Sequence, residues 1–397
     1  MVIQFIVSPT FSSDRMKKMF PMIKQCLDEL LNTLEMNAND KKEVDMKLMY
    51  GNLTMDVIST CAFATKTNSY KDPNSPFIKN AHKSLNPKSY RLVLSIMLPK
   101  FVMKLINMKH AIEETCCEFF FKLTRLIINE RKNSNQKYND FIDLLLNAEK
   151  DKPNEVSDEF DSNESHHVNE GKEELEIQKK VMSGVEHYIT DDEILANAWI
   201  FFVAGYDTTA TTLSFATYEL ALNPDVQQKL YEEVMSSVDT NGEIDYDLLS
   251  KLSYLDAVVS ETLRLHALSI RVARIASQDY KLGDTGITIK KGQAVSIPTY
   301  AIAHLEEFYP NPESFIPERF LPENKPKLVP YTYLPFGGGP RNCVGMRFGL
   351  MEAKLGLAHV IRRYRFLKCA NTDIPVSLIR NLFLHTPKRV IVGIDKR

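Results

Sequence analysis

Residues 336–345 read FGGGPRNCVG and place one cysteine, Cys343, in a glycine-rich loop directly before a helix-like segment at residues 346–364. Glycines let backbone N–H groups turn toward the sulfur, and the N-terminus of the next helix adds positive potential. Such a setting favours a thiolate, the ligand that pushes electron density onto haem iron for O–O cleavage. The alternative, a buried cysteine in an ordinary turn, does not account for the whole pattern.

The charge of the chain is uneven. The net charge of the 397 residues is −2, yet residues 151–176 carry ten acidic and two basic residues, so the remainder carries +6. We expect residues 151–187 to form an acidic, disordered insert in a single domain that spans residues 1–397. A mildly basic body suits an acidic protein partner or an anionic membrane surface. It lacks the dense Lys/Arg stripe of a nucleic-acid-binding protein.

Neither the other cysteines nor the apolar segments indicate secretion or membrane insertion. The five other cysteines form no C-x-x-C pair, so we expect reduced, mostly buried thiols. No run of eighteen apolar residues occurs, which argues against a transmembrane helix in this chain. Residues 92–106 are richly apolar but broken by Pro99. They could lie on a membrane, but we expect them to close over the core.

Hydrophobic spacing predicts a mainly α fold with small β-sheets. Thr190 and Glu193 form a capping box that starts a helix, and Asn223-Pro224 ends it. The predicted helices cover residues 16–34, 46–63, 112–131, 190–222, 224–238 and 254–265. The predicted strands cover residues 280–282, 287–289, 294–297, 376–379 and 390–394.

The middle of the 190–222 helix reads AGYDTT at residues 204–209, and glycine and threonine are poor choices for a helix interior. One interpretation is a groove for dioxygen, with Thr208 and Asp207 relaying protons. The other is a close helix crossing inside the core. This segment alone supports the two interpretations equally, and the Cys343 loop favours the dioxygen groove.

Glu261 and Arg264 lie three residues apart on one predicted helix, and Arg319 follows in a proline-rich coil. An exposed pair of this kind contributes little to stability. A solvated side chain is likewise the default interpretation of Arg274.

Three of these motifs resemble the cytochrome P-450 family: the haem-binding loop F-x-x-G-x-R-x-C-x-G, the A-G-x-D/E-T-T helix, and E-x-x-R with P-E-R-F. Residues 8–13, 55–58, 218–221 and 224–230 carry the resemblance along the chain. It looks closest to the microsomal drug- and steroid-oxidising branch allied to thromboxane synthase. The implied fold is the cytochrome P-450 fold without the N-terminal anchor, first sheet strands and first helices.

The resemblance implies a role for each motif. Cys343 would ligate the iron of haem b, Arg274 and Arg341 would bind the haem propionates, and Thr208 with Asp207 would deliver protons. A buried network of Glu261, Arg264 and Arg319 would lock the coil that supports the cysteine loop. Other implied haem contacts are Phe336, Gly345, Ala204 and Gly205. The implied substrate-lining residues are Phe202, Val203, Ser269, Ile270, Leu382 and Phe383.

The implied reaction inserts one oxygen atom of O₂ into a small lipophilic molecule: a xenobiotic, a steroid or a fatty-acid-like compound. Electrons would come from NADPH through a separate flavoprotein reductase, so NADPH itself would not bind this chain. The full-length form would lie on the cytoplasmic face of the endoplasmic reticulum membrane.

Three departures from the family pattern stand out. First, the family has a membrane anchor, an early sheet and helices before the segment with which this chain begins. Second, Gln4 stands where the family has an arginine that holds a propionate, and the family tryptophan would lie before Met1. Third, residues 266–269 (HALS) replace a proline pair near the substrate. Two alternatives therefore stay open: a haem-thiolate isomerase of lipid peroxides, and a shortened, inactive product that binds haem poorly. We expect residues 1–397 expressed alone to be mostly insoluble or haem-free.

Overall fold

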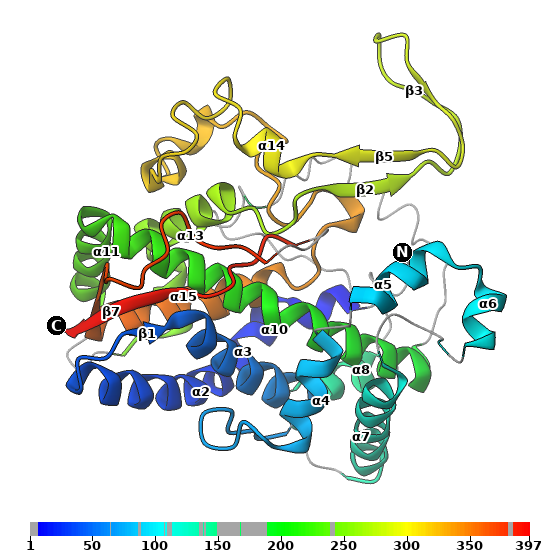
Figure 1. Ribbon diagram of the computed structural model, residues 1–397, viewed down its shortest axis with the longest axis horizontal. Coiled ribbons are helices and arrows are strands. Elements are labelled where there is room, and N and C mark those ends of the chain that lie inside the picture. The colour runs from blue at the N-terminus through cyan, green and yellow to red at the C-terminus, as the bar shows by residue number, and fades with distance from the viewer. Residues whose placement is uncertain are drawn as a thin grey trace.

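The longest helix of the chain, α10 (Asp191–Leu222), crosses the middle of the molecule (Figure 1). This computed structural model describes residues 7–63, 65–85, 89–106, 108, 113–134, 138, 140–148, 167, 189–238, 243–379 and 384–397. Gln4, Leu382 and Phe383 lie outside the described residues, as does the expected 151–187 insert apart from His167.

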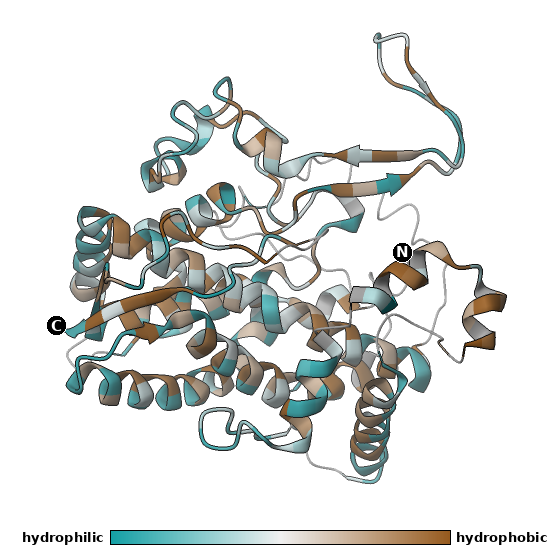
Figure 2. Cartoon of the chain, viewed as in Figure 1, coloured by the Kyte–Doolittle hydropathy of each residue, from teal (hydrophilic) through white to brown (hydrophobic). Residues whose placement is uncertain are grey.

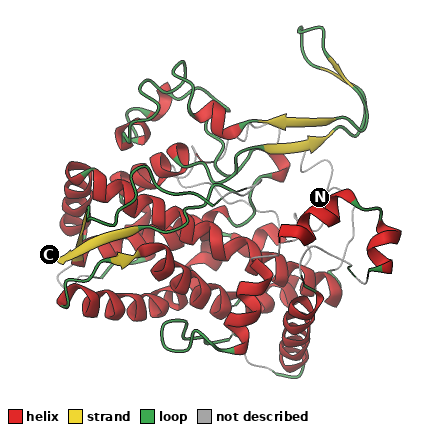
Figure 3. Ribbon diagram, in the orientation of Figure 1, coloured by secondary structure: helices red, strands yellow, loops and turns green. Residues whose placement is uncertain are grey.

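The described part is mainly helical (Figure 3), which confirms the predicted fold class. The helices besides α10 are α2 (Ser13–Asn39), α3 (Met46–Phe63), α4 (Pro76–Leu85), α5 (Ser89–Met97), α6 (Lys100–Leu105), α7 (Glu114–Lys132), α8 (Phe141–Ala148), α11 (Pro224–Ser237), α12 (Tyr246–Lys251), α13 (Ser253–Leu265), α14 (Thr299–Ala303) and α15 (Met346–Arg363). Short 3-10 turns are η1 (Ser8–Phe11), η3 (Pro317–Phe320), η4 (Lys325–Lys327) and η5 (Gly339–Arg341).

The strands form small antiparallel sheets at the edges of the helical body. The strands are β1 (Val44–Asp45), β2 (Val272–Ile275), β3 (Tyr280–Lys281), β4 (Thr288–Ile289), β5 (Ala294–Ile297), β6 (Tyr364–Leu367) and β7 (Ile391–Lys396). One sheet has the order β1-β7-β6, and β2-β5 and β3-β4 are two-stranded antiparallel sheets.

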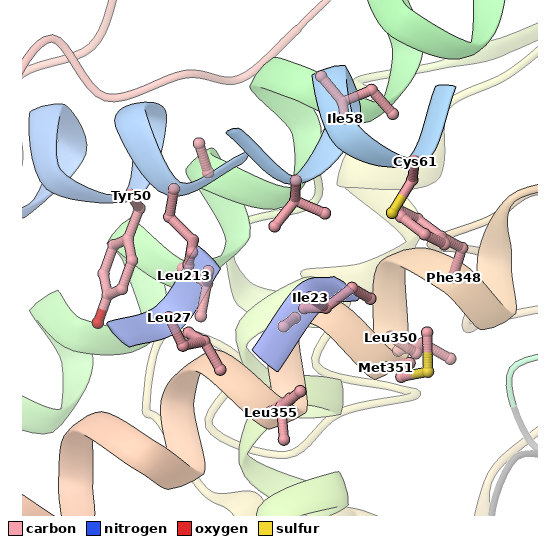
Figure 4. Packing of buried hydrophobic residues seen from close by; sticks show 14 of the residues in the cluster. Ile23, Leu27, Tyr50, Ile58, Cys61, Leu213, Phe348, Leu350, Met351 and Leu355 are labelled. Carbon is pink, nitrogen blue, oxygen red and sulfur yellow. The ribbon is translucent and has the colours of Figure 1, made fainter. Parts of the chain in front are cut away.

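The hydrophobic core forms where α2, α3, α10 and α15 meet. Figure 4 shows its centre: Ile58 of α3, Leu213 of α10 and Leu355 of α15 are all within 1% exposure. Gly205 allows α10 to pack close to α3, because a Cβ built at this position would lie 2.8 Å from Ile58 Cδ1. The helix-crossing interpretation of this segment therefore describes a real contact, on the α3 side of α10.

The ends of α10 confirm the sequence prediction. The Thr190 side chain accepts from the Glu193 backbone N–H, and the Glu193 carboxylate accepts from the Thr190 backbone N–H at 2.8 Å. Asn223 caps the other end, and Pro224 opens α11. Local capping chemistry thus fixes both ends of the helix.

Two expectations about the fold are wrong. Residues 376–379 form no strand: Leu378 makes one isolated bridge to Pro387, which has no N–H with which to extend a ladder. Residues 92–106 do not close over the core. They form most of α5, all of α6 and the short segments that follow each helix. Met97, Phe101 and Leu105 are 74%, 68% and 81% exposed. Figure 2 shows these two helices as a brown, apolar projection from the body.

The described helices include none whose length and hydropathy would suit crossing a bilayer. This finding covers only the described residues.

Acid should destabilise the fold through His359, which lies buried on α15 with its Nε2 unpartnered among the described residues. Burial, followed by the nearby Arg362, lowers the pKa of His359 from 6.5 to about 4. The unfolded chain binds this proton at a higher pH than the folded chain. Lowering the pH from about 6.5 to about 4 should therefore cost up to about 3 kcal/mol of unfolding free energy. Denaturant unfolding at several pH values should show that the unfolding free energy of His359→Leu falls less steeply with falling pH than that of the wild type. The same pH dependence in both proteins would contradict the role of His359.

Candidate functional site

An apolar cavity of about 870 Å³, counted to its open mouth, lies between α10 and the Cys343 loop. Its mainly hydrophobic walls are typical of a site for a cofactor or small molecule. The lining side chains come from η1, α8, α10, α13, α15 and the loop: Val7, Phe11, Phe141, Asn197, Ile200, Phe201, Ala204, Gly205, Thr208, Thr209, Thr212, Val259, Leu263, Leu268, Phe336, Cys343, Val344, Gly345, Phe348, Gly349, Leu350 and Ala353.

The cysteine loop forms one wall of this cavity. Gly337 and Gly339 adopt φ angles of 76° and 72°, a left-handed conformation that side chains disfavour. The loop closes where the Cys343 backbone N–H donates to the Phe336 carbonyl at 2.8 Å. Met346 then starts α15. The Cys343 side chain is left open to the cavity instead of packing into the core.

The Cys343 thiol does not have the lowered pKa that the sequence led us to expect. Burial by the surrounding protein raises the pKa of this thiol, and the Gly345 backbone N–H opposes the rise. In the chain alone, burial of the thiol therefore outweighs the Gly345 backbone N–H. A metal ion bound at the sulfur would supply the missing positive charge, since metal binding displaces the thiol proton.

One face of α10 forms the opposite wall, and its lining residues follow the helical period. Asn197, Ile200, Phe201, Ala204 and Gly205 lie on this face, with the three threonines at 208, 209 and 212 one to two turns further on. The Thr208 hydroxyl donates to the Ala204 carbonyl at 2.7 Å.

Phe202 and Val203 lie off this face, which contradicts the prediction that they line a substrate site. Phe202 is fully buried among the aromatic rings of Phe63, Phe120 and Trp199. Val203 packs partly buried against the core. The prediction took consecutive residues, whereas a helix presents only every third or fourth residue to one side.

Asp207 also points away from the cavity. Lys47 of α3 donates to its carboxylate at 2.6 Å and to the Thr211 hydroxyl at 2.7 Å. Asp207 and Thr208 are therefore adjacent in sequence but face different neighbours.

Glu261, Arg264 and Arg319 come together in the interior. Arg264 donates to both carboxylate oxygens of Glu261, at 2.8 and 2.9 Å, and Arg319 Nε lies 3.5 Å from the same carboxylate. The Ile316 backbone N–H donates to Glu261 at 2.9 Å, and Arg264 also donates to the Ala303 carbonyl. The network thus links α13 to the coil that precedes the Cys343 loop.

Arg274 and Arg341 lie side by side on the exposed side of the loop. The Arg274 guanidinium donates to the Arg341 carbonyl at 3.3 Å. Ser269 and Ile270 are not part of the cavity lining: the Ser269 hydroxyl donates to the Arg271 carbonyl, and Ile270 is exposed.

Sequence reasoning missed several aromatic lining residues. Phe11, Phe141, Phe201 and Phe348 surround the cavity, and the rings of Phe141 and Phe201 stack at 4.3 Å. A helical projection of residues 197–212 indicates Ile200 and Phe201. The contributions of Phe11 and Phe141 depend on tertiary packing and leave no local signal.

These residues fit a haem. A single soft sulfur donor opens into an apolar cavity, and the small residues Ala204 and Gly205 line the facing helix. Arg341 lies in the loop and Arg274 donates to its carbonyl, and neither arginine is among the residues that line the cavity. The sulfur donor and the apolar walls match two parts of such a group, the iron and the macrocycle.

Comparison with known proteins matches the chain to one family of proteins. The family model "Cytochrome P450", written here as cytochrome P-450, matches residues 3–168 and 161–394. Cytochrome P-450 3A2 of Rattus norvegicus is 37% identical over 396 residues, which covers 99% of this chain and 73% of the rat protein. Cytochrome P-450 3A1 of the same species is 36% identical, and cytochrome P-450 3A11 of Mus musculus is 35% identical, with the same coverage.

Proposed function

The chain belongs to the cytochrome P-450 family, and we propose that the cavity between α10 and the Cys343 loop is its haem and substrate site. The protein is a haem-thiolate monooxygenase that takes electrons from NADPH through a reductase. The observation that carries the assignment of the site is the Cys343 side chain, which opens into the cavity opposite the Ala204–Thr208 face of α10.

Each residue role in the site is part of the proposal. Cys343 would ligate iron, and Arg274 and Arg341 would pair with the propionates. Phe336 and Gly345 would cover the sulfur side, with Ala204 and Gly205 on the other. When bound, a thiolate-ligated haem activates O₂ for insertion of one oxygen atom.

The substrate is a small lipophilic molecule of the xenobiotic, steroid or fatty-acid-like class. The apolar side chains that line the cavity, among them Ile200, Phe201 and Leu268, offer dispersion contacts and few hydrogen bonds. Leu382 and Phe383, from the loop outside the described residues, stay candidate substrate contacts.

The test is oxidation of a panel of lipophilic compounds under isotopically labelled O₂. One labelled oxygen atom per product, formed only with NADPH and reductase, is the expected result. Conversion of a lipid hydroperoxide without either would instead support the isomerase alternative.

Thr208→Ala should uncouple electron use from product formation. The Thr208 side chain lines the cavity and its hydroxyl donates to the Ala204 carbonyl, which supports our proposal that this hydroxyl relays a proton. Without it, product per NADPH should fall by about tenfold or more, and hydrogen peroxide should rise. Thr208→Ser restores the hydroxyl and should restore coupling. Wild-type coupling in Thr208→Ala would remove this hydroxyl from the relay.

Asp207 was the expected partner of Thr208. Its ion pair with Lys47 means that it could deliver protons only after that pair opens.

We also propose that the protein acts on the cytoplasmic face of the endoplasmic reticulum membrane, beside a flavoprotein reductase. The apolar α5–α6 projection supports contact with a membrane surface, because large exposed apolar patches are rare on soluble proteins.

Replacing Phe101 and Leu105 together by Ser should weaken binding to phosphatidylcholine–phosphatidylserine vesicles by roughly tenfold or more, because two large apolar side chains leave the contact. Met36→Ser is the matched control, since Met36 is also exposed but lies on α2. Equal vesicle binding by all three proteins would contradict a role for α5 and α6.

A further inference from the structure

Glu352 is a buried acid in α15 for which the proposed function has no use. The residue is 1% exposed, and its Oε1 has no hydrogen-bond partner among the described residues. The Thr209 side chain of α10 is its hydrogen-bonding neighbour. An unpaired carboxylate in such a place would be costly.

The surroundings of Glu352 favour its neutral form. The thiols of Cys26 on α2 and Cys61 on α3 are close enough to interact with its charge, and both have raised pKa values because of burial. Among the described residues no Lys, Arg or His offsets the burial of Glu352. Burial therefore raises the pKa of Glu352 well above its ordinary range.

Thr209 lies between this acid and the cavity. Thr209 lines the cavity, as do Gly349, one turn before Glu352, and Ala353, directly after it. A Cβ built on Gly349 would lie 3.8 Å from the Thr209 hydroxyl oxygen. The contact between Glu352 and Thr209 is thus at the cavity wall.

The direction of the hydrogen bond follows from the orphaned Oε1. A neutral acid has one O–H and one C=O, and here one of the two is left without a partner. A buried carbonyl without a partner costs less than a buried donor without one. The O–H therefore faces Thr209 and donates to its hydroxyl oxygen.

The two adjacent threonines then present opposite polarity to the cavity. Thr208 uses its hydrogen on the Ala204 carbonyl at 2.7 Å and offers a lone pair. Thr209 accepts from Glu352, so its own hydrogen is free to point into the cavity. The wall gains one acceptor and one donor next to each other.

We propose that Glu352 is a neutral carboxylic acid that positions the Thr209 hydroxyl as a hydrogen-bond donor toward the cavity. The inference rests on the proposed function, because the cavity is taken as the oxygen and substrate site. Glu352 acts through Thr209 and is a positioning residue.

The first test is the infrared spectrum of the resting, haem-loaded protein. The carbonyl stretch of a protonated carboxylic acid should be present near neutral pH and disappear in Glu352→Gln. Thr209→Val removes the acceptor, so the band should shift but persist. If Glu352→Gln removes no such band, the acid is ionised and the inference fails.

The second test uses coupling of NADPH to product. Glu352→Leu and Thr209→Val should each reduce product per NADPH by roughly fivefold to tenfold, the loss of one neutral hydrogen bond. Glu352→Gln keeps an N–H donor and should retain wild-type coupling at every pH. Met351→Leu, a volume-conserving change on the same helix, controls for packing. Uncoupling in Glu352→Gln equal to that in Glu352→Leu would overturn the positioning role.

The two proposals fail separately. Reductase-dependent oxidation and uncoupling by Thr208→Ala test the function of the site without involving Glu352. The infrared band tests Glu352 without requiring turnover.

Discussion

Replacing Cys343 with His should abolish the reduced carbon monoxide absorption band from which the cytochrome P-450 family takes its name. Of the six cysteines, all within the described residues, Cys343 alone lines the cavity. No second thiolate could replace it, and an imidazole ligand lacks the electron donation of a thiolate. The measurement is the difference spectrum of the reduced protein with and without carbon monoxide, and the expected loss is complete.

Cys369→Ser is the matched control, because Cys369 lies near β7, where its thiol is placed to donate to the Ile391 carbonyl at 3.8 Å. This variant should retain the full band. A wild-type spectrum in Cys343→His would remove Cys343 from the role of iron ligand, and with it the central observation behind the site.

Glu261→Gln should destabilise the fold by about 3–5 kcal/mol. The change leaves Arg264, whose side chain is 0% exposed, without the carboxylate that its Nε and Nη2 contact. It also removes the negative charge beside Arg319. Burial raises the pKa of Glu261, and the guanidinium of Arg264 opposes that rise, so the carboxylate depends on its partner. Denaturant unfolding measures the loss directly, and haem content should fall with it.

Asp279→Asn provides the comparison for this prediction. It breaks an ion pair with Lys290 in which both side chains are more than half exposed. Such pairs contribute at most about 1 kcal/mol, so stability should barely change. A similar loss of unfolding free energy in both variants would mean that burial does not explain the contribution of the Glu261 network to stability.

Local signals were sufficient to predict the helical frame. The Thr190 capping box and Asn223-Pro224 bound α10 within one residue, because caps and proline act on their immediate neighbours. The Cys343 loop could also be predicted from the sequence, because Gly337 and Gly339 adopt the left-handed φ angles that other residues avoid.

Contacts between distant segments could not be predicted in the same way. Lys47 and Asp207 are 160 residues apart, and nothing in either segment indicates their ion pair. The neighbours of Glu352 likewise come from three other helices, α2, α3 and α10. Phe202 was misplaced for a simpler reason, since its helical phase was not considered. The exposure of α5 and α6 was missed because an apolar helix in sequence looks the same whether it faces a core or a surface.

The contact between Gly205 and Ile58 has a consequence for engineering the cavity. A methyl group added at position 205 would point to the α3 side of α10, where its carbon would lie 2.8 Å from Ile58 Cδ1, so the change would push α10 away from α3 and toward the cavity. Shortening Ile58 to Val removes the atom that is struck, so the pair of changes could be accommodated where the single change is not. The width of the cavity can therefore be changed by substituting Ile58, which is not among the residues that line it. Mutant libraries restricted to the lining positions would not include this residue.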